Sequence, residues 1–264
     1  MTPGTRSEDP VRGRPVELRY DPDMGRIWPW PTLLLEQVAS WMAALPGDPW
    51  LDAGCGGGKL GEILGERKKL IGLDIDGKRL VYARTQTHLT LLCGSLTSLP
   101  LADGSMGGIA CVETLEHISD MAAVLAEFSR CLRPRGYLLL SMPSVTLRSL
   151  WQMSRRGIPV YCSEDEHVRE LSSVAIGGFR NRFETWPGLE SQVAAHGFEV
   201  VKQGGIGYLF PMWTGRLAWL EHVMNIFYRE RVNRLLGKLP GIRLFPYYRI
   251  YLFRRKPASG ITRG

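Results

Sequence analysis

The chain has 264 residues, of which 44% are hydrophobic and 22% charged, a composition that indicates a globular protein and excludes a disordered one. The length predicts one domain with insertions. No apolar run reaches the roughly 18 residues of a membrane-spanning helix. The net charge of +7 comes from residues 201–264, which hold 12 Lys and Arg against two Glu.

The N-terminal region precedes the first predicted helix. Residues 1–15 are polar and are expected to be disordered, and residues 16–30 contain aromatic side chains that either form a lid or pack on the domain edge. Residues 1–30 have no apolar signal region, so we expect a cytoplasmic protein. An amphipathic helix is predicted from Pro31 to Leu45, where Pro46-Gly47 stops it.

The most informative stretch runs from Trp50 to Asp76. A short apolar run ends at the carboxylate Asp52, a glycine cluster follows, and a helical pattern leads to a second apolar run that ends at Asp74. This order predicts half of a nucleotide-binding α/β unit. Glycines let the backbone turn sharply, and an acid at the second strand tip can accept hydrogen bonds from ribose hydroxyls. The alternative for Asp74 is an N-cap of the next helix.

Two kinds of nucleotide ligand are compatible with a glycine turn. Gly56, Gly58 and Gly61 match the G-x-G-x-x-G pattern of dinucleotide-binding folds. In those folds the helix N-terminus faces a pyrophosphate, and Asp52 before the turn would repel that anion. The carboxylate instead suits a ligand that has a cationic amine and no phosphate.

Strands and helices continue to alternate after Asp76. Helices are predicted at 77–84, 120–132 and 187–196, and strands at 89–93, 108–112, 137–142, 198–203 and 247–254. Residues 133–136 are predicted to form a turn before the strand at 137–142, and the strand at 89–93 is expected to be buried. Alternation at this spacing predicts a parallel sheet with helices on both faces.

The motifs LDAGCGGG (51–58) and GLDID (72–76), with the run from Cys111 to Ser144, resemble class I S-adenosylmethionine-dependent methyltransferases of the ubiquinone-biosynthesis type. The resemblance covers about residues 49–145 and resumes at HGFEVV (196–201). It implies a Rossmann-like three-layer α/β sandwich, a mostly parallel seven-stranded sheet whose last strand is antiparallel. It also implies S-adenosylmethionine as the cofactor.

The resemblance also implies roles for individual residues. Asp52 would anchor the amine of the cofactor and Asp74 its ribose hydroxyls. The further candidates are Gly54, Cys55 and Gly56 at the amino acid end, Ile75, Ser95 and Leu96 around the adenine, and Val112 and Glu113 near the methionine part.

Three positions depart from the family pattern, one of them Arg135, which replaces one of the two glycines usual before the fifth strand. Ser95 replaces the usual acid that bonds the adenine, and a neutral hydrogen bond there is weaker by about a factor of two. Gly107 replaces the usual aspartate before the fourth strand, from which we expect a looser turn. The five cysteines form no Cys-x-x-Cys pair, so we expect reduced, buried thiols and no metal site.

Two histidines are candidate general bases. His117 can take a proton from a hydroxyl near neutral pH; alternatively it caps the next helix or bonds Glu113 or Glu116. His167 is a weaker candidate in an acidic run, where a solvated surface role is the alternative.

The domain is predicted to span residues 31–256, with insertions at 146–185 and 207–245 and a tail at 257–264. Both insertions are expected to shape the site of a small-molecule or lipid-like acceptor, with methylation on oxygen favoured over nitrogen or carbon. Residues 213–239 are basic and aromatic, and three roles are compatible with this pattern. The segment is expected to be an interfacial helix on an anionic membrane, a wall of the acceptor pocket, or a helix packed on the domain.

RNA binding is disfavoured because no RNA-binding motif is present. Alternative functions are tRNA modification, or binding by a catalytically degenerate scaffold.

Overall fold

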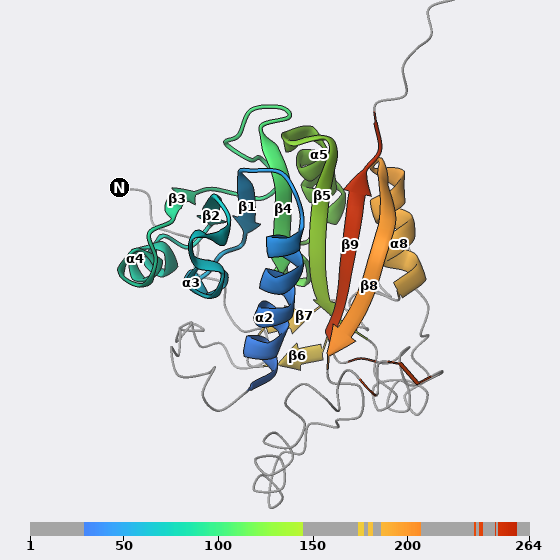
Figure 1. Ribbon diagram of the computed structural model, residues 1–264, viewed down its shortest axis with the longest axis horizontal. Helices are drawn as coiled ribbons and strands as arrows, with labels where there is room; N and C mark the ends of the chain where they lie inside the picture. The colour runs from blue at the N-terminus through green and yellow to red at the C-terminus, as the bar shows by residue number, and fades with distance from the viewer. Residues whose placement is uncertain are drawn as a thin grey trace, which may run out of the picture.

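The computed structural model describes residues 29–144, 174–176, 179–181, 186–206, 235, 238–239, 246 and 248–257. Seven strands of this part form one sheet in the order β3-β2-β1-β4-β5-β9-β8 (Figure 1). Their bounds are β1 Trp50–Ala53, β2 Leu70–Asp74, β3 Thr90–Cys93, β4 Met106–Val112, β5 Leu132–Pro143, β8 Phe198–Ile206 and β9 Tyr248–Arg255. The first five strands are parallel, and β9 is antiparallel to β5 and β8. The predicted fold class, with its antiparallel last strand, is confirmed.

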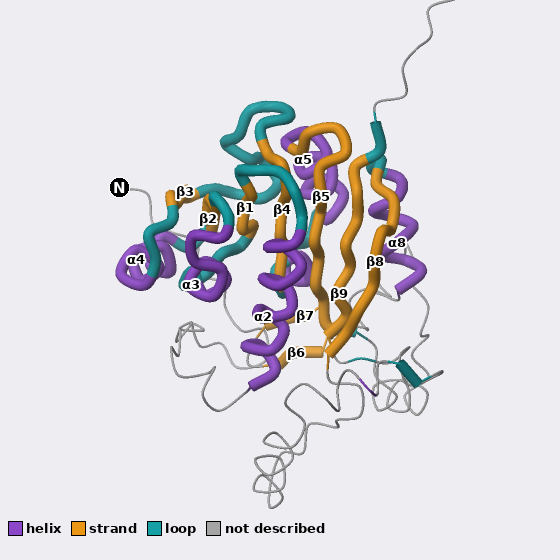
Figure 2. The backbone as a smooth tube through the Cα atoms, in the orientation of Figure 1, coloured by secondary structure: helices purple, strands orange, loops and turns teal. Residues whose placement is uncertain are grey.

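Helices cover both faces of the sheet, which gives three layers (Figures 1 and 2). Helices α2 (Pro29–Ala44) and α3 (Lys59–Leu64) pack on one face, with α4 (Gly77–Gln86) beside α3. Helices α5 (Met121–Cys131) and α8 (Trp186–Ala195) pack on the other face. A separate antiparallel pair, β6 (Val174–Ile176) and β7 (Phe179–Asn181), had no counterpart in the sequence-based prediction.

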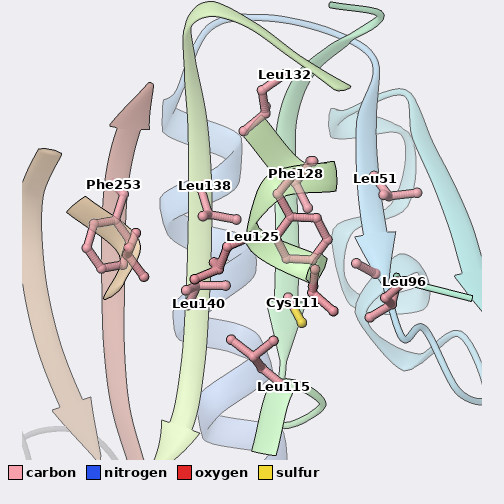
Figure 3. Close-up of a cluster of buried hydrophobic side chains, with 14 of the residues drawn as sticks. Leu51, Leu96, Cys111, Leu115, Leu125, Phe128, Leu132, Leu138, Leu140 and Phe253 are labelled. Carbon is pink, nitrogen blue, oxygen red and sulfur yellow. The ribbon is translucent and has the colours of Figure 1, made fainter. Parts of the chain in front are cut away.

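The core explains why these elements form. Alternate residues of β1 point to opposite faces, so Trp50 joins the cluster under α2 and Leu51 joins the cluster under α5. Helix α5 begins at the N-cap Asp120, whose side chain accepts a hydrogen bond from the Ala123 N–H at 2.9 Å. Its apolar stripe, which includes Leu125 and Phe128, fills the centre of the larger cluster (Figure 3).

The strand order positions the site. From β1 the chain moves outward through β2 to β3, then returns to add β4 on the other side of β1. The carboxyl ends of β1 and β4 therefore flank a topological switch point, where open α/β sheets bind their ligands. Asp52 and Val112 lie at these two strand ends.

Four local predictions were wrong. Strand β3 is an exposed to half-buried edge, not a buried strand, because only β2 pairs with it. The predicted turn at 133–136 belongs to β5, which begins at Leu132. Gly107 lies inside β4 and not in a loose turn: a Cβ there would lie 2.8 Å from backbone atoms of Gly47 and Asp48, so an aspartate does not fit. Cys93 is exposed, whereas Cys55, Cys111 and Cys131 are buried free thiols as expected.

Several predictions fall outside the described residues. They concern the N-terminal arm up to residue 28, His167, Cys162, nearly all of the basic segment 213–239 and most of the tail. In the part of the chain that the structure describes, no helix is both long and apolar enough to cross a membrane.

Candidate active site

The turn between β1 and α3 is built by glycines at positive φ. Gly54 has a φ of 84°, and a Cβ on it would lie 2.3 Å from the Thr114 side chain. The N–H groups of Gly54 and Cys55 both donate to the Leu73 carbonyl, at 2.8 and 2.9 Å. Gly56 has a φ of 52° and only open space where its Cβ would be. The turn is thus packed against the β4 side at Gly54 and open at Gly56.

Asp74 ties the glycine turn to the end of β2. Its Oδ2 accepts a hydrogen bond from the Gly56 N–H at 2.8 Å, and its Oδ1 accepts one from the Asp76 N–H at 2.9 Å. The N-cap of α4 is Asp76, which accepts from the Lys78 N–H. The alternative that Asp74 caps this helix is therefore wrong, and its carboxylate keeps lone pairs for further donors.

Asp52 is a buried acid with one side-chain oxygen that accepts no hydrogen bond from the described residues. Its side chain is 3% exposed, and its Oδ2 has no hydrogen-bond partner among the described residues. Burial, and then the charge of Asp74, raise the pKa of this carboxyl from 3.8 to about 7. An unsatisfied buried carboxylate oxygen is costly, and a cationic amine is the group that would satisfy it best.

The thiol of Cys55 lies in the same turn but is unsuited to act as a nucleophile. Burial raises its pKa, and the charges of Asp52 and Asp74 raise it further. The thiolate is the reactive form of cysteine. Cys55 therefore packs in the turn as a small apolar side chain.

The residues predicted around the adenine lie in different environments. Ile75 follows Asp74 directly and is 75% exposed, so its side chain is available to cover a flat ring. The Ser95 hydroxyl is 2.8 Å from the Thr97 hydroxyl and accepts from the Thr97 N–H. Leu96 packs into the core, so its side chain is not available to a ligand (Figure 3).

At the end of β4, Val112 is followed by Glu113 in an unusual backbone conformation, with a φ of 50°. Ser141 of β5 holds Glu113 from both sides: its hydroxyl donates to Oε1 at 2.7 Å, and its carbonyl and hydroxyl both accept from the Glu113 N–H at 3.2 Å. Burial, then the neighbouring Glu116, raise the pKa of Glu113 well above its ordinary value, against the opposing effect of the Ser141 hydrogen bond. The conformation that L residues rarely adopt is held by these bonds.

The short helix η2 (Leu115–His117) follows and presents two ionisable side chains. The Glu116 side chain is 2% exposed and that of His117 is 37% exposed. Sequence reasoning named Glu116 only as an alternative partner of His117, and did not foresee its burial. The signal was Leu115 one residue earlier, which anchors the turn in the core.

Among the described residues, no cluster of three or more His, Cys, Asp and Glu side chains has a geometry that could hold a metal ion. Four acids nevertheless line the carboxyl ends of β1, β2 and β4. They are Asp52, Asp74, Glu113 and Glu116.

A family model described as a methyltransferase domain matches residues 51–140. The chain is similar to 24-methylenesterol C-methyltransferase 2 from Arabidopsis thaliana, with 26% identity over 205 residues, 72% of this chain and 54% of that protein. It is also similar to the ubiquinone biosynthesis O-methyltransferase of Alkalilimnicola ehrlichii, with 31% identity over 116 residues, 41% of this chain and 47% of that protein. The chain thus spans about half the length of these curated relatives.

Among solved structures, a SAM-dependent methyltransferase from Thermotoga maritima, described as a possible histamine N-methyltransferase, shares the fold. It has a TM-score of 0.60 and 17% identity, over 88% of this chain and 93% of that one. The strand order and this structural similarity show the Rossmann-like α/β fold of that methyltransferase structure. The matched domain and these relatives confirm the resemblance to class I S-adenosylmethionine-dependent methyltransferases that the sequence predicted.

Proposed function

We propose that the chain is an S-adenosylmethionine-dependent methyltransferase that methylates a hydroxyl oxygen of a small-molecule or lipid-like acceptor. The observation that carries the proposal is the buried Asp52 oxygen, which has no hydrogen-bond partner in the described part of the chain and lies beside an open glycine turn. A small-molecule acceptor is supported by the two relatives above, which are named as a methylenesterol methyltransferase and a methyltransferase of ubiquinone biosynthesis.

The residues of the crevice fit this cofactor. Asp52 would hold its amine, directly or through water, and Asp74 would accept from its ribose hydroxyls with the lone pairs that its two backbone contacts leave. Ile75 would cover the adenine with its exposed side chain. The other proposed contacts are Gly54, Cys55 and Gly56 on the turn, Ser95 and the Leu96 backbone at the adenine edge, and Val112 and Glu113 at the end of β4.

The cofactor supplies an activated methyl group on a positive sulfur, so the protein has little covalent chemistry to perform. The chain must align the acceptor, exclude water and remove the hydroxyl proton. We assign the last task to His117, which is partly exposed next to the end of β4 and whose imidazole can accept a proton from a hydroxyl. His167 remains a second, weaker prediction outside the described residues.

Calorimetric titration of the full chain with S-adenosylmethionine, S-adenosylhomocysteine and NADH tests the cofactor assignment. We expect the first two to bind and NADH not to bind. The Asp52→Asn variant should lose affinity for both, while the exposed Glu62→Gln variant on α3 serves as the matched control and should bind normally. Binding of NADH alone, or of none of the three, would refute the assignment and favour another nucleotide or a degenerate scaffold.

Carbon methylation is the second candidate, because the sterol C-methyltransferase relative aligns over 72% of this chain. Incubating the protein with a lipid and metabolite extract and S-adenosylmethionine labelled with ¹³C on the methyl group separates the two. The carbon chemical shift of an O-methyl product differs clearly from that of a C-methyl product. A C-methyl product would overturn the proposed acceptor atom and leave the cofactor assignment intact.

We further propose a cytoplasmic protein that associates with anionic membrane through residues 213–239. The support is the basic surplus of residues 201–264, which attracts anionic lipid at low ionic strength. Co-sedimentation with vesicles of phosphatidylserine and phosphatidylcholine is the test, with neutral vesicles as the control. Equal recovery with both kinds of vesicle would remove the proposal.

A further inference from the structure

The turn η2 is held rigidly, and this fixes the directions of its two ionisable side chains. Leu115 is 1% exposed and belongs to the core cluster that includes Cys111 and Leu140 (Figure 3). The His117 N–H donates to the Thr114 carbonyl at 3.1 Å, which closes the turn. Strand β7 lies against the same turn. With Leu115 anchored, Glu116 is directed into the protein and His117 toward its surface.

The two side chains meet at their tips. Glu116 Oε1 lies 3.9 Å from His117 Nε2, an ion-pair separation when the imidazole is protonated. The other oxygen of Glu116, Oε2, is buried and has no hydrogen-bond partner in the part of the chain that the structure describes. A buried carboxylate with an unpartnered oxygen is costly, and a cation held nearby lowers this free-energy cost.

Exposure decides which of the two groups can touch a substrate. The Glu116 side chain is 2% exposed, so it cannot reach an acceptor molecule directly. The His117 side chain is 37% exposed, so it can. Glu116 can therefore influence a proton transfer only through the imidazole.

We propose that Glu116 is a positioning residue for His117, which it orients toward the acceptor and whose imidazolium form it stabilises. The inference rests on the proposed function. In the reaction, the acceptor oxygen forms a bond to the methyl carbon as the bond from that carbon to sulfur breaks. The hydroxyl proton moves to His117, and the resulting imidazolium is paired with the Glu116 carboxylate. The products are the methyl ether, the neutral thioether and one proton held by the pair.

The surroundings favour a shared proton at this pair. Burial raises the pKa of Glu116 to about 8. Burial and then Glu116 raise the pKa of Glu113 at the end of β4, and the pKa of the Cys111 thiol is likewise raised by burial and then by Glu116. Strand β5 contributes the neutral Ser141, which is hydrogen-bonded to Glu113. Because the groups interact, the pair should lose its last proton in a step that belongs to both residues.

The sign of the pH effect follows. Burial keeps a proton on Glu116 up to about pH 8, so the ionised carboxylate that pairs with the imidazolium is present above that pH. Replacing Glu116 by Gln removes this carboxylate, so His117 should then lose its proton at a lower pH than in the wild type.

Histidine ring signals in NMR spectra of the free, full-length protein test the inference without any acceptor. The His117 signal is assigned by its loss in the His117→Gln variant. We expect it to move through a step near pH 8 in the wild type, and to show one step at lower pH in Glu116→Gln. The exposed Glu62→Gln variant is the control and should titrate like the wild type.

The wild type alone suffices if Glu116→Gln does not fold: a single His117 step, with no change near pH 8, overturns the inference. Identical His117 titrations in the wild type and in a folded Glu116→Gln also overturn it. Failure of S-adenosylhomocysteine to bind would refute the proposed function separately, since the titration requires no ligand. Once an acceptor is found, the pH at half-maximal rate should fall in Glu116→Gln and be restored toward the wild type in Glu116→Asp.

Discussion

The buried carboxyl of Asp52 should lower the stability of the free protein, and in its ionised form it should bind the amine of the cofactor. Its pKa is raised from 3.8 to about 7, so the folded state binds this proton more tightly than the unfolded state does. Stability is then lost as pH rises from about 4 to about 7, and the loss is complete above that range. At about 1.36 kcal/mol per pKa unit, the loss is at most about 4 kcal/mol.

The Asp52→Asn variant removes this charge and keeps the shape of the side chain. We expect its free energy of unfolding in urea to exceed that of the wild type at pH 8 by up to a few kcal/mol, and to be similar at about pH 4. Equal stability differences at both pH values would refute the assigned ionisation of Asp52. Glu62→Gln on the surface should show no such pH dependence.

Cofactor binding should respond in the opposite direction. A cationic amine favours the ionised form of Asp52, so the affinity for S-adenosylhomocysteine should fall by up to about tenfold for each pH unit below 7. The same preference predicts that binding at pH 7 releases part of a proton, which calorimetry in buffers of different ionisation enthalpy measures. In Asp52→Asn both effects should be absent; their persistence would show that another group is responsible.

Three further variants test the rest of the site. Asp74→Ala removes the acceptor of the Gly56 and Asp76 N–H groups, so it should abolish binding of S-adenosylhomocysteine and cost about 1–3 kcal/mol in urea unfolding; near-wild-type affinity would contradict its role. Gly54→Ala places a Cβ 2.3 Å from Thr114 and should destabilise the protein by about 1–3 kcal/mol, whereas Gly54→Ala with Thr114→Ser should recover part of the loss. His117→Ala should keep cofactor affinity and lower turnover by about 10²–10⁴-fold; full turnover at every pH would exclude it as the base.

The cofactor half of the site could be predicted from the sequence because its information is local. Asp52, the glycines and Asp74 lie within one strand-turn-helix-strand unit, where strand ends and chain reversals are readable from residue type. The positive φ of Gly54 and Gly56 was implicit in the need for a sharp turn.

Other features depend on contacts between distant segments. The burial of Glu116 requires β7 and β5 beside η2, and the bonds of Glu113 come from Ser141. The tight packing at Gly107 arises from the turn at Gly47, about 60 residues earlier in the chain. The exposure of β3 follows from its place at the sheet edge, which residue periodicity does not encode.

The most direct measurement is a crystal structure of the chain in complex with S-adenosylhomocysteine. We predict that its amine is bound by Asp52 Oδ2, directly or through one water molecule, and that its ribose hydroxyls donate to Asp74. A complex in which that crevice stays empty, or in which the amine lies away from Asp52, would contradict the account.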